Sequence, residues 1–395
     1  MANSYNFNQI STILNQIVAD AQGRTADITT TPRDTSQFVT MAQTALSAGT
    51  DPIMKSISQL INKSLFVARP YKSTLDILKW DDITFGNAVR KFTPVSVDSA
   101  SDNPEFEDAP ADGSSADQWT VKRPKVLQMQ YLGAEQWQVQ EPTVFEHQLN
   151  SAFRSPEELG QFLAMLRTHV MNEMEQEQEQ LARMTLSSFI ASKIKNDTTN
   201  VIHLLTEYNA ATGSGLDAQS VYQPTNFGAF IRWTAARMRE ISALMEERSV
   251  KFHQSLTGYT ILRHTPREYQ RCVMYGKASA MIDSMVRESF FDNWLKFPQY
   301  STVNFFQNIN SPQKIVMTPP VLSASGNVSK SATTVTQDNI FAVLYDKAAI
   351  GYNVLNEGVN QTPINAKARY YNTFHHFVKR YCIDTTENGV VFLLD

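Results

Sequence analysis

One long segment without helix-breaking residues constrains this chain more than any other feature. Ser155 precedes Pro156 and Glu158, so the serine can cap a helix, the proline suits its first turn and the glutamate completes a capping box. From Pro156 to about Ile194 there is no further proline and one glycine, Gly160. A helix over this range has about 39 residues and extends about 58 Å. Globular helices average about 11 to 12 residues, so this one needs a role suited to its length.

The predicted helix carries an interrupted apolar stripe. With a turn of about 100° per residue, its apolar side chains fall within about 80° of one another, at Leu163, Leu166, Val170, Met174, Leu181 and Met184. Glu177 falls inside this stripe and is expected to face a basic or amide group of its own or a neighbouring subunit. Glu175 and Glu179 are expected on the opposite side, where Glu179 can pair with Arg183. The stripe is too short for an independent coiled coil, which favours a helix lying across a sheet or neighbouring elements.

The stretch "HVMNEMEQEQEQLARMT", residues 169–185, raises the possibility of a carboxylate metal site. His169 and Glu173 share a helical face, but a ferritin-like centre requires Glu-x-x-His, which this chain lacks. His375 and His376 are adjacent in a predicted strand and point to opposite faces. Motifs for zinc hydrolases, phosphate loops, dinucleotide-binding turns and serine nucleophile elbows are absent from the sequence. We therefore predict no catalytic, cofactor-binding or metal-ligating residue.

Two segments predict the arms of a long β-hairpin. Residues 85–97 are the first, and residues 126–140 are the second, in which apolar side chains alternate with glutamines at the period of a half-buried strand. The connection is acidic and has no lysine or arginine from Asp98 to Asp117; its acids are Asp98, Asp102, Glu105, Glu107, Asp108, Asp112 and Asp117. The sequence "KRPK" follows directly and supplies Lys122, Arg123 and Lys125.

Three interpretations of this charged connection stay open. It is a solvated loop tip, a flap that docks on basic groups of another subunit, or a calcium site. The calcium interpretation is the weakest, because the acids lack the spacing of a calcium-binding loop. The candidate subunit contacts are Glu105, Glu107, Asp108, Lys122, Arg123, Lys125 and, on the long helix, Glu177.

Composition limits the classes of function. A formal net charge of −4 gives no basic stripe for strong nucleic-acid binding, while 42% hydrophobic and 19% charged residues are typical of a globular protein. Cys272 and Cys382 are expected to be buried free thiols in a reducing compartment. The first 22 residues lack the pattern of a signal peptide, and no apolar run is long enough to span a membrane, so we expect neither export nor insertion.

The remaining elements are mixed. A polar arm is expected over residues 1–50 and a short helix over 51–66. Residues 200–320 indicate mixed α and β structure, with a helix capped by Thr225. The strand "TGYTILRH" is expected to lead directly into a helix whose capping box is formed by Thr265, Pro266 and Glu268. The last sixty residues predict strands, with the tight turn of a final hairpin at Asn388 and Gly389. The fold class is therefore α+β.

This order of elements resembles the major capsid protein of tailed double-stranded DNA bacteriophages, which has an HK-97-like fold. The resemblance rests on "VLQMQYLGAEQWQVQ", the long helix "SPEELGQFLAMLRTHVMNEMEQEQEQLARMTLSSFIASKI", "TILRHTPREYQRCVM" and "IFAVLYDKAAIGYNVL". It is most similar to the compact versions in small short-tailed phages of the phi-29 and picovirus kind. It implies an N-terminal arm and short helix (1–70), an extended hairpin called the E-loop (71–150), the spine helix of a P-domain (151–198), an A-domain (199–335) and closing P-domain strands (336–395).

The resemblance also implies a function. It implies a non-enzymatic protein that self-assembles, as pentamers and hexamers, into the icosahedral shell around a phage double-stranded DNA genome. Such a protein resides in the virion capsid and assembles in the bacterial cytoplasm. Scaffold, portal and decoration proteins are implied partners, with weak non-specific contact to packaged DNA, no membrane and no cofactor. An encapsulin-like compartment shell, a rod-like tail or scaffold protein, and a carboxylate-bridged metal enzyme on the long helix are the alternatives.

Overall fold

The computed structural model describes residues 75–80, 89–94, 126–131, 135–140, 143–145, 156–255, 261–288, 300–322 and 328–395. The chain divides into two compact units. The first comprises Met1–Asp76, Ala134–Leu181 and Asn353–Arg380; the second comprises Ile77–Gly133, Ala182–Tyr352 and Tyr381–Asp395. The expected arm, the helix over 51–66 and the charged connection between the hairpin arms lie outside the described residues. Helices and strands are mixed, as the α+β prediction requires.

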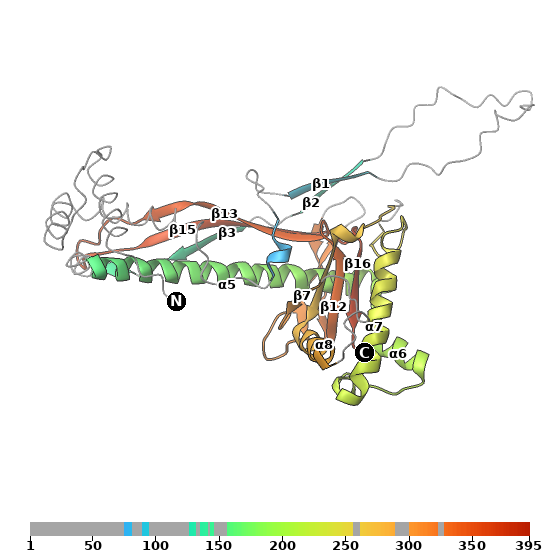
Figure 1. Ribbon diagram of the computed structural model, residues 1–395. Helices are drawn as coiled ribbons and strands as arrows, with labels where there is room; N and C mark the ends of the chain where they lie inside the picture. The colour runs from blue at the N-terminus through green and yellow to red at the C-terminus, as the bar shows by residue number, and fades with distance from the viewer. Residues whose placement is uncertain are drawn as a thin grey trace, which may run out of the picture. The chain divides into compact units, whose positions relative to one another are not determined.

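The predicted long helix is confirmed. Helix α5 spans Pro156–Asn196 and has 41 residues, two more at its C-terminal end than the sequence indicated (Figure 1). Lys193 and Lys195 in its last turn complement the negative end of the helix dipole. Residues up to Leu181 belong to the first unit and the remainder to the second. Neither α5 nor any other described helix has the length and apolar character needed to cross a membrane.

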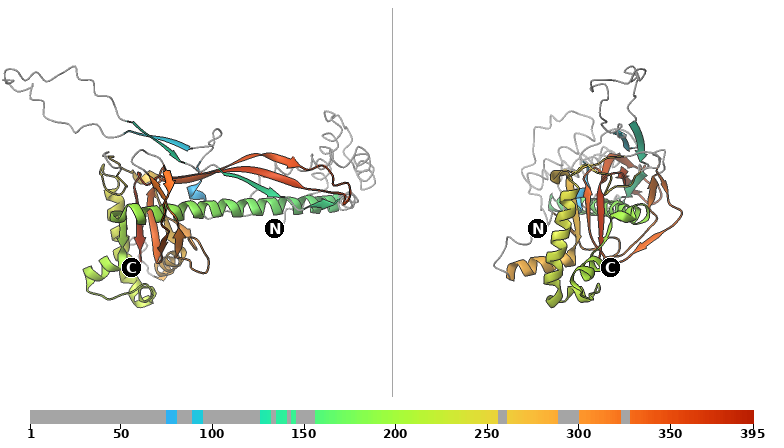
Figure 2. Two further views of the ribbon diagram at one scale, coloured as in Figure 1. Left: turned by 180° about the vertical axis from the view of Figure 1, so that it is seen from behind. Right: turned by 90° about the vertical axis from the view of Figure 1, so that its right-hand side faces the viewer.

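The first unit contains a three-stranded sheet in the order β13 (Ile350–Gln361), β15 (Thr373–Ile383) and β3 (Glu135–Gln140), whose long strands β13 and β15 run side by side (Figures 1 and 2). Strand β15 is antiparallel to β3, with Phe377 opposite Trp137. A small apolar core joins this sheet to α5 through Val139, Val170 and Phe377. The short strands β4 (Val144–Phe145) and β14 (Tyr370–Tyr371) pair separately.

The predicted hairpin is confirmed in part. Strand β1 (Val89–Pro94) pairs antiparallel with β2 (Val126–Tyr131), so the two segments do come together. The second arm is shorter than expected, because Glu135–Gln140 forms β3 and pairs with β15 instead. Burial of Val139 against α5 gives β3 an apolar contact of its own.

The second unit is organised around a five-stranded sheet in the order β5 (Val201–His203), β16 (Gly389–Leu393), β12 (Ile340–Asp346), β6 (Gln270–Tyr275) and β7 (Tyr300–Val303). The central strand β12 is antiparallel to β16 and β6, whereas β5 and β7 add parallel to the outer sides. Every residue of β12 is buried, which explains its continuous apolar sequence. The last strands of the chain thus divide between two sheets.

Helices cover the five-stranded sheet. Helices α6 (Leu204–Thr212), α7 (Pro224–Leu244) and α8 (Gly276–Glu288) share one apolar core with the sheet. This core includes Phe230 of α7 and the strand residues Met274, Leu344 and Phe392. The C-terminal part of α5 packs through Phe189, whose ring centre lies 6.1 Å from that of Tyr345. The smaller elements are η1 (Asp76–Leu78), η3 (Thr198–Asn200), η4 (Ser220–Tyr222), η5 (Arg267–Tyr269), β8 (Ile315–Met317), β9 (Pro320–Leu322), β10 (Val328–Lys330) and β11 (Val335–Gln337).

Polar side chains attach the second part of α5 to an adjoining segment. The Arg183 guanidinium lies 3.7 Å from the centre of the Phe305 ring and also donates to the Phe305 carbonyl oxygen. The hydroxyl of Ser192 donates to the Pro320 carbonyl oxygen at 3.0 Å. Small residues and hydroxyls on this stretch therefore allow a helix that is buried on nearly all sides to satisfy neighbouring backbone groups.

The capping box predicted at Thr265 is wrong. Residues 267–269 form the short helix η5, residues 270–275 form β6, and α8 begins only at Gly276. The sequence "QRCVMY" is a buried strand, and burial in the middle of the sheet outweighed the local helix signal. The Thr265 hydroxyl donates to Asp346 at 2.7 Å instead of capping a helix.

Two neighbouring expectations also need correction. Within "TGYTILRH", residues 257–260 lie outside the described residues, and residues 261–264 form no strand. The backbone of Arg263 pairs with Ser249 as an isolated β-bridge. Helix α7 begins at Pro224 after Gln223, so Thr225 lies inside the helix rather than at its cap. Proline fits the first helical turn because its missing N–H has no partner there in any helix.

The predicted terminal hairpin at Asn388 and Gly389 is wrong as well. Strands β15 and β16 belong to different sheets, and Gly389 is the first residue of β16. A Cβ atom at Gly389 would lie 2.6 Å from Cζ of the Phe189 ring. The glycine is therefore required by the close approach of α5 to the sheet, and not by a turn.

Gly389→Ala should lower the free energy of unfolding by about 1–3 kcal/mol, because the buried Phe189 ring has to move. Gly215→Ala is the matched control, since no atom lies within 4 Å of its Cβ position. Thermal unfolding followed by circular dichroism measures both. Equal melting temperatures for the two variants would contradict the packing described here.

The two cysteines are buried and free, as the sequence predicted. Burial raises the pKa of the Cys272 thiol to about 12. We expect the native protein to react slowly with a thiol-specific reagent at pH 8, because the thiolate is the reactive form. Both thiols should react fully after denaturation. Rapid labelling at Cys272 in the native protein, located by peptide mass spectrometry and with the near-ultraviolet circular dichroism unchanged, would show that Cys272 is not in this environment.

Candidate functional site

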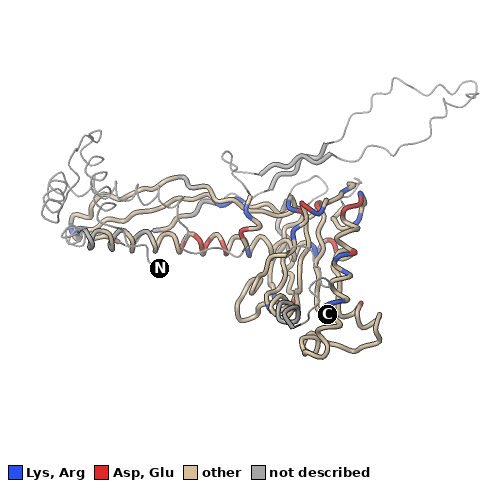
Figure 3. The backbone as a smooth tube through the Cα atoms, viewed as in Figure 1, with Lys and Arg blue, Asp and Glu red and all other residues tan. Residues whose placement is uncertain are grey.

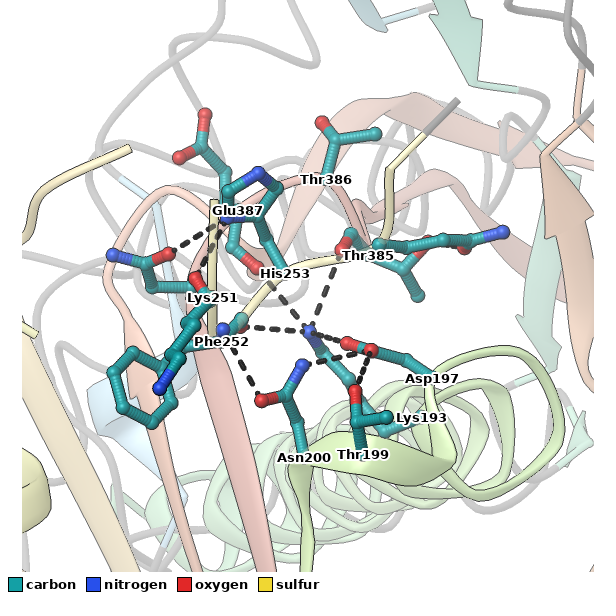
Figure 4. A network of polar contacts seen from close by, with 12 residues as sticks. Lys193, Asp197, Thr199, Asn200, Lys251, Phe252, His253, Thr385, Thr386 and Glu387 are labelled. Carbon is teal, nitrogen blue, oxygen red and sulfur yellow. Dashed lines mark hydrogen bonds and ion pairs between the residues drawn. The ribbon is translucent and has the colours of Figure 1, made fainter. Parts of the chain in front are cut away.

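The last turn of helix α5 contains a buried lysine, Lys193. The Lys193 side chain is 0% exposed, and its Nζ atom donates to Asp197 Oδ2 at 2.8 Å. It also donates to the carbonyl oxygens of Phe252 at 3.1 Å, Thr385 at 3.4 Å and Glu387 at 3.4 Å (Figure 4). Burial lowers the pKa of Lys193, and the hydrogen bond and charge of Asp197 oppose that shift. Four oxygen atoms thus surround one amine, which we call the Lys193 cage.

The residues that follow α5 complete one side of the cage. Asp197 Oδ1 accepts hydrogen bonds from the Asn200 amide at 2.7 Å and from the Thr199 hydroxyl at 3.4 Å. Asn200 Oδ1 in turn accepts from the backbone N–H of Phe252 at 3.1 Å. The carboxylate is therefore paired and hydrogen-bonded at both oxygens, which is the condition for burying a charge at acceptable cost.

Phe252 has a left-handed backbone, with φ of 67°, which a non-glycine residue adopts at a cost of about 1–3 kcal/mol. Its carbonyl oxygen accepts from Lys193 and from the Gly389 N–H at 2.7 Å. Its own N–H donates to Asn200. The surrounding bonds therefore hold a conformation that the isolated segment would avoid.

The connection between β15 and β16, residues 384–388, forms the other side of the cage. All five of its residues are buried although all are polar, "DTTEN". Asp384 Oδ1 accepts from the Thr386 N–H at 2.8 Å, and Glu387 lies 3.2 Å from Arg263. The Asn388 amide donates to Thr265 at 3.1 Å. This connection is a satisfied polar core and not the exposed turn that its composition indicates.

The cage therefore fixes three distant segments to one another. It joins the end of α5, the strained residue Phe252 and the 384–388 connection within the second unit. A lysine that acts as a nucleophile needs access to a substrate and a reacting carbonyl, whereas every donor position of Lys193 is directed at protein oxygens. Its arrangement supports a structural role, in which Lys193 joins three segments, rather than a catalytic role.

The glutamates of α5 differ from the prediction. Figure 3 shows acidic residues along α5. Positions 171, 175 and 179 form a buried face, with Glu175 5% and Glu179 9% exposed, so these two are not on a solvent-facing side. Asn172, Gln176 and Gln180 are the exposed positions. The predicted wheel was oriented by apolar side chains alone, whereas β15 also presents a cation to α5, since Nζ of Lys379 lies 4.0 Å from Glu177.

Glu177 faces a basic group within its own unit. Its Oε2 atom lies 4.0 Å from Nζ of Lys379 on β15, and both side chains are partly exposed. A pair of this kind contributes at most about 1 kcal/mol. This contact lies within one chain, so a contact of Glu177 with a neighbouring subunit stays a prediction.

The other predicted contact residues, Glu105, Glu107, Asp108, Lys122, Arg123 and Lys125, lie outside the described residues. Within the described ranges, no three histidine, cysteine, aspartate or glutamate side chains are grouped as metal ligands would be. His375 is buried and His376 is partly exposed, in keeping with their positions on opposite faces of β15.

Comparison with known proteins decides the class. The sequence model of the family described as Phi29-like phage major capsid protein matches residues 14–393, nearly the whole chain. The chain belongs to this family. A search of curated protein sequences found no significant match.

Solved structures agree at the level of the fold. A chain in the structure of the head fiber and inner core protein gp22 of native bacteriophage P68 matches with a TM-score of 0.53 and 11% identity, over 82% of this chain and 85% of that one. The capsid structure of Staphylococcus phage Andhra matches with a TM-score of 0.50 and 10% identity, over 80% and 83%. The resemblance seen in the sequence is confirmed: the protein is a phage major capsid protein that forms the head shell of the virion, and it is not an enzyme.

The residues of the Lys193 cage were missed by sequence reasoning. A signal was present, because Lys193 interrupts the small and apolar run "SSFIAS-K-I" and stands four residues before Asp197, the spacing of a helical ion pair. The backbone acceptors at Phe252, Thr385 and Glu387 carry no side-chain signature. The sequence of this capsid protein therefore does not predict the cage, whose backbone acceptors are brought together by the fold.

Lys193→Met should destabilise the capsid protein by about 3–5 kcal/mol, because it leaves the Asp197 carboxylate buried without its cation. Lys193→Met combined with Asp197→Asn removes both charges and should recover part of that loss. Denaturant unfolding of the unassembled protein measures these two variants and Asp197→Asn alone. If the double variant is as unstable as the sum of the two single variants, Lys193 and Asp197 do not act as a pair.

Proposed function

We propose that this capsid protein forms the head from pentamers and hexamers of itself, with its β1–β2 hairpin acting as a flap on neighbouring copies. The observation that carries this proposal is the pairing of the hairpin. Strands β1 and β2 form a two-stranded sheet, and neither pairs with a further strand in the described part of the chain. A two-stranded hairpin alone is marginally stable in water, so another surface is needed to support it.

In this proposal the elements take the roles of an HK-97-like subunit. Residues 1–70 form the arm, 71–150 the E-loop, and 151–198 the spine helix, which matches α5 closely. The A-domain extends over 199–335 and includes α6, α7, α8 and β5–β7. Because β12 and β16 pair with β5 and β6, we assign them to the A-domain sheet and keep β13 and β15 as the closing P-domain strands.

The charged end of the hairpin is proposed to set the register between subunits. Seven acids and the following "KRPK" lie in one connection of the sequence, so a tip from one copy can meet basic groups of another. We place Glu105, Glu107 and Asp108 against Lys122, Arg123 and Lys125 of a neighbouring copy. Such contacts add specificity without a large exposed apolar surface before assembly.

The implied partners follow from the same proposal. Scaffold, portal and decoration proteins would bind the growing or finished shell, and packaged DNA would touch its wall weakly, since the net charge of −4 does not favour tight phosphate binding. An encapsulin-like compartment would use a similar subunit. The family match to phage capsid proteins favours the head.

The triple variant Lys122→Glu, Arg123→Glu and Lys125→Glu should remain folded but fail to form shells, because the proposed contacts become repulsive. Adding Glu105→Lys, Glu107→Lys and Asp108→Lys to the same chain should restore assembly by exchanging the charges. Electron microscopy and sedimentation of the purified proteins measure shell yield, and circular dichroism checks folding.

Lys122→Arg with Lys125→Arg is the matched control, since it keeps the charge and should assemble normally. Normal shells from the charge-reversed triple variant would overturn the proposed contact. A wild-type chain that stays monomeric under every assembly condition would count against pentamers and hexamers altogether.

A further inference from the structure

A further surface, on the second unit, has the composition of a subunit contact. From Tyr300 to Gln313 the sequence contains no charged residue, and Gln307, Asn308, Asn310 and Ser311 are exposed. Ile309, in the same loop, is 70% exposed, more than any other large apolar side chain in the described residues. Val316 on β8 is 46% exposed. Charged residues are depleted from the centres of protein interfaces, and this loop shows that depletion around two exposed aliphatic side chains.

The loop is held in one conformation. The Gln307 amide donates to the Val316 carbonyl oxygen at 3.0 Å, and the Val316 N–H donates to Gln307 Oε1 at 2.6 Å. The Asn310 N–H donates to Asn308 Oδ1 at 2.9 Å, and the Phe306 N–H donates to the Pro312 carbonyl oxygen at 2.9 Å. Single exposed aliphatic side chains are common, but a preorganised one loses little entropy when it binds. Ile309 is therefore exposed on a loop whose conformation is already fixed for binding.

The Gln307 amide also determines how a partner can bind. Strand β8 pairs with β11 on one side, and on the other side Gln307 occupies both backbone hydrogen-bonding groups of Val316. A strand from another molecule cannot add at that position without displacing the amide. The surface therefore suits side-chain packing, with Ile309 as the part that inserts. The ion pair of Lys314 with Asp338 at 3.1 Å supplies a charged border, as at the rim of an interface.

We propose that residues 307–316, here the Gln307 loop, form a contact surface for a second copy of this chain in the shell, with Ile309 as its apolar anchor. The occupant follows from the family, because a shell is built from many copies of this chain and each copy needs contacts on several sides. This surface is separate from the hairpin flap. The proposal rests on shell assembly but not on the pentamer and hexamer arrangement.

Ile309→Cys tests the contact directly. Both native cysteines are buried, so the wild-type chain provides the background labelling. A maleimide should modify position 309 rapidly in the unassembled protein and at least about tenfold more slowly in purified shells, since a buried thiol is shielded from the reagent. Equal labelling rates in the unassembled protein and in shells would overturn the proposal.

Ile309→Asp and Ile309→Leu form a matched pair. The aspartate variant should lower shell yield at least about tenfold, corresponding to the loss of one apolar anchor, and leave the melting temperature of the unassembled chain unchanged. The leucine variant should assemble like the wild type. Wild-type yields from Ile309→Asp would overturn the contact, whereas failure of the wild type itself to assemble would refute the shell arrangement and not this surface alone.

Discussion

The second unit depends on one buried amine. Lys193 holds the end of α5, the strained Phe252 and the 384–388 connection in a single set of hydrogen bonds. Each segment alone would be unfavourable, since one carries a buried charge, one a left-handed backbone and one a buried polar run. Together the three segments supply one another's hydrogen-bond donors and acceptors. A buried ionic group of this kind adds little to stability over an apolar replacement, but its geometry can specify a single arrangement.

Helix α5 passes through two environments that its sequence reflects. Its first part has one exposed side bearing Asn172, Gln176 and Gln180, whereas its later residues are buried on nearly all sides and include serines and alanines. Small residues permit the close approach that brings Phe189 against Gly389. A helix of this length would be hard to explain in a compact enzyme. In this capsid protein its residues are divided between the two compact units.

The sequence predicted those elements whose signal is local and strong. The 41-residue helix, the β1–β2 pairing, the buried thiols and the capsid family all followed from patterns within the chain. Three of the failures share one cause, which is that tertiary burial outweighed a local signal. "QRCVMY" became a central strand despite a capping motif before it, "DTTEN" became a buried connection despite its turn composition, and Glu175 and Glu179 are buried despite their charge. The backbone carbonyl groups around Lys193 could not be predicted, because any residue can supply them.

The side chain of Gln307 has a consequence for specificity. A protein that assembles from many copies can also associate incorrectly. An open strand edge favours strand-to-strand pairing into fibres over closed shells. One amide placed across the backbone of Val316 closes that route locally while leaving Ile309 available beside it. The same few residues thus distinguish two kinds of self-association. They leave side-chain packing, which depends on shape, available, and they block strand addition, which needs only a free backbone edge.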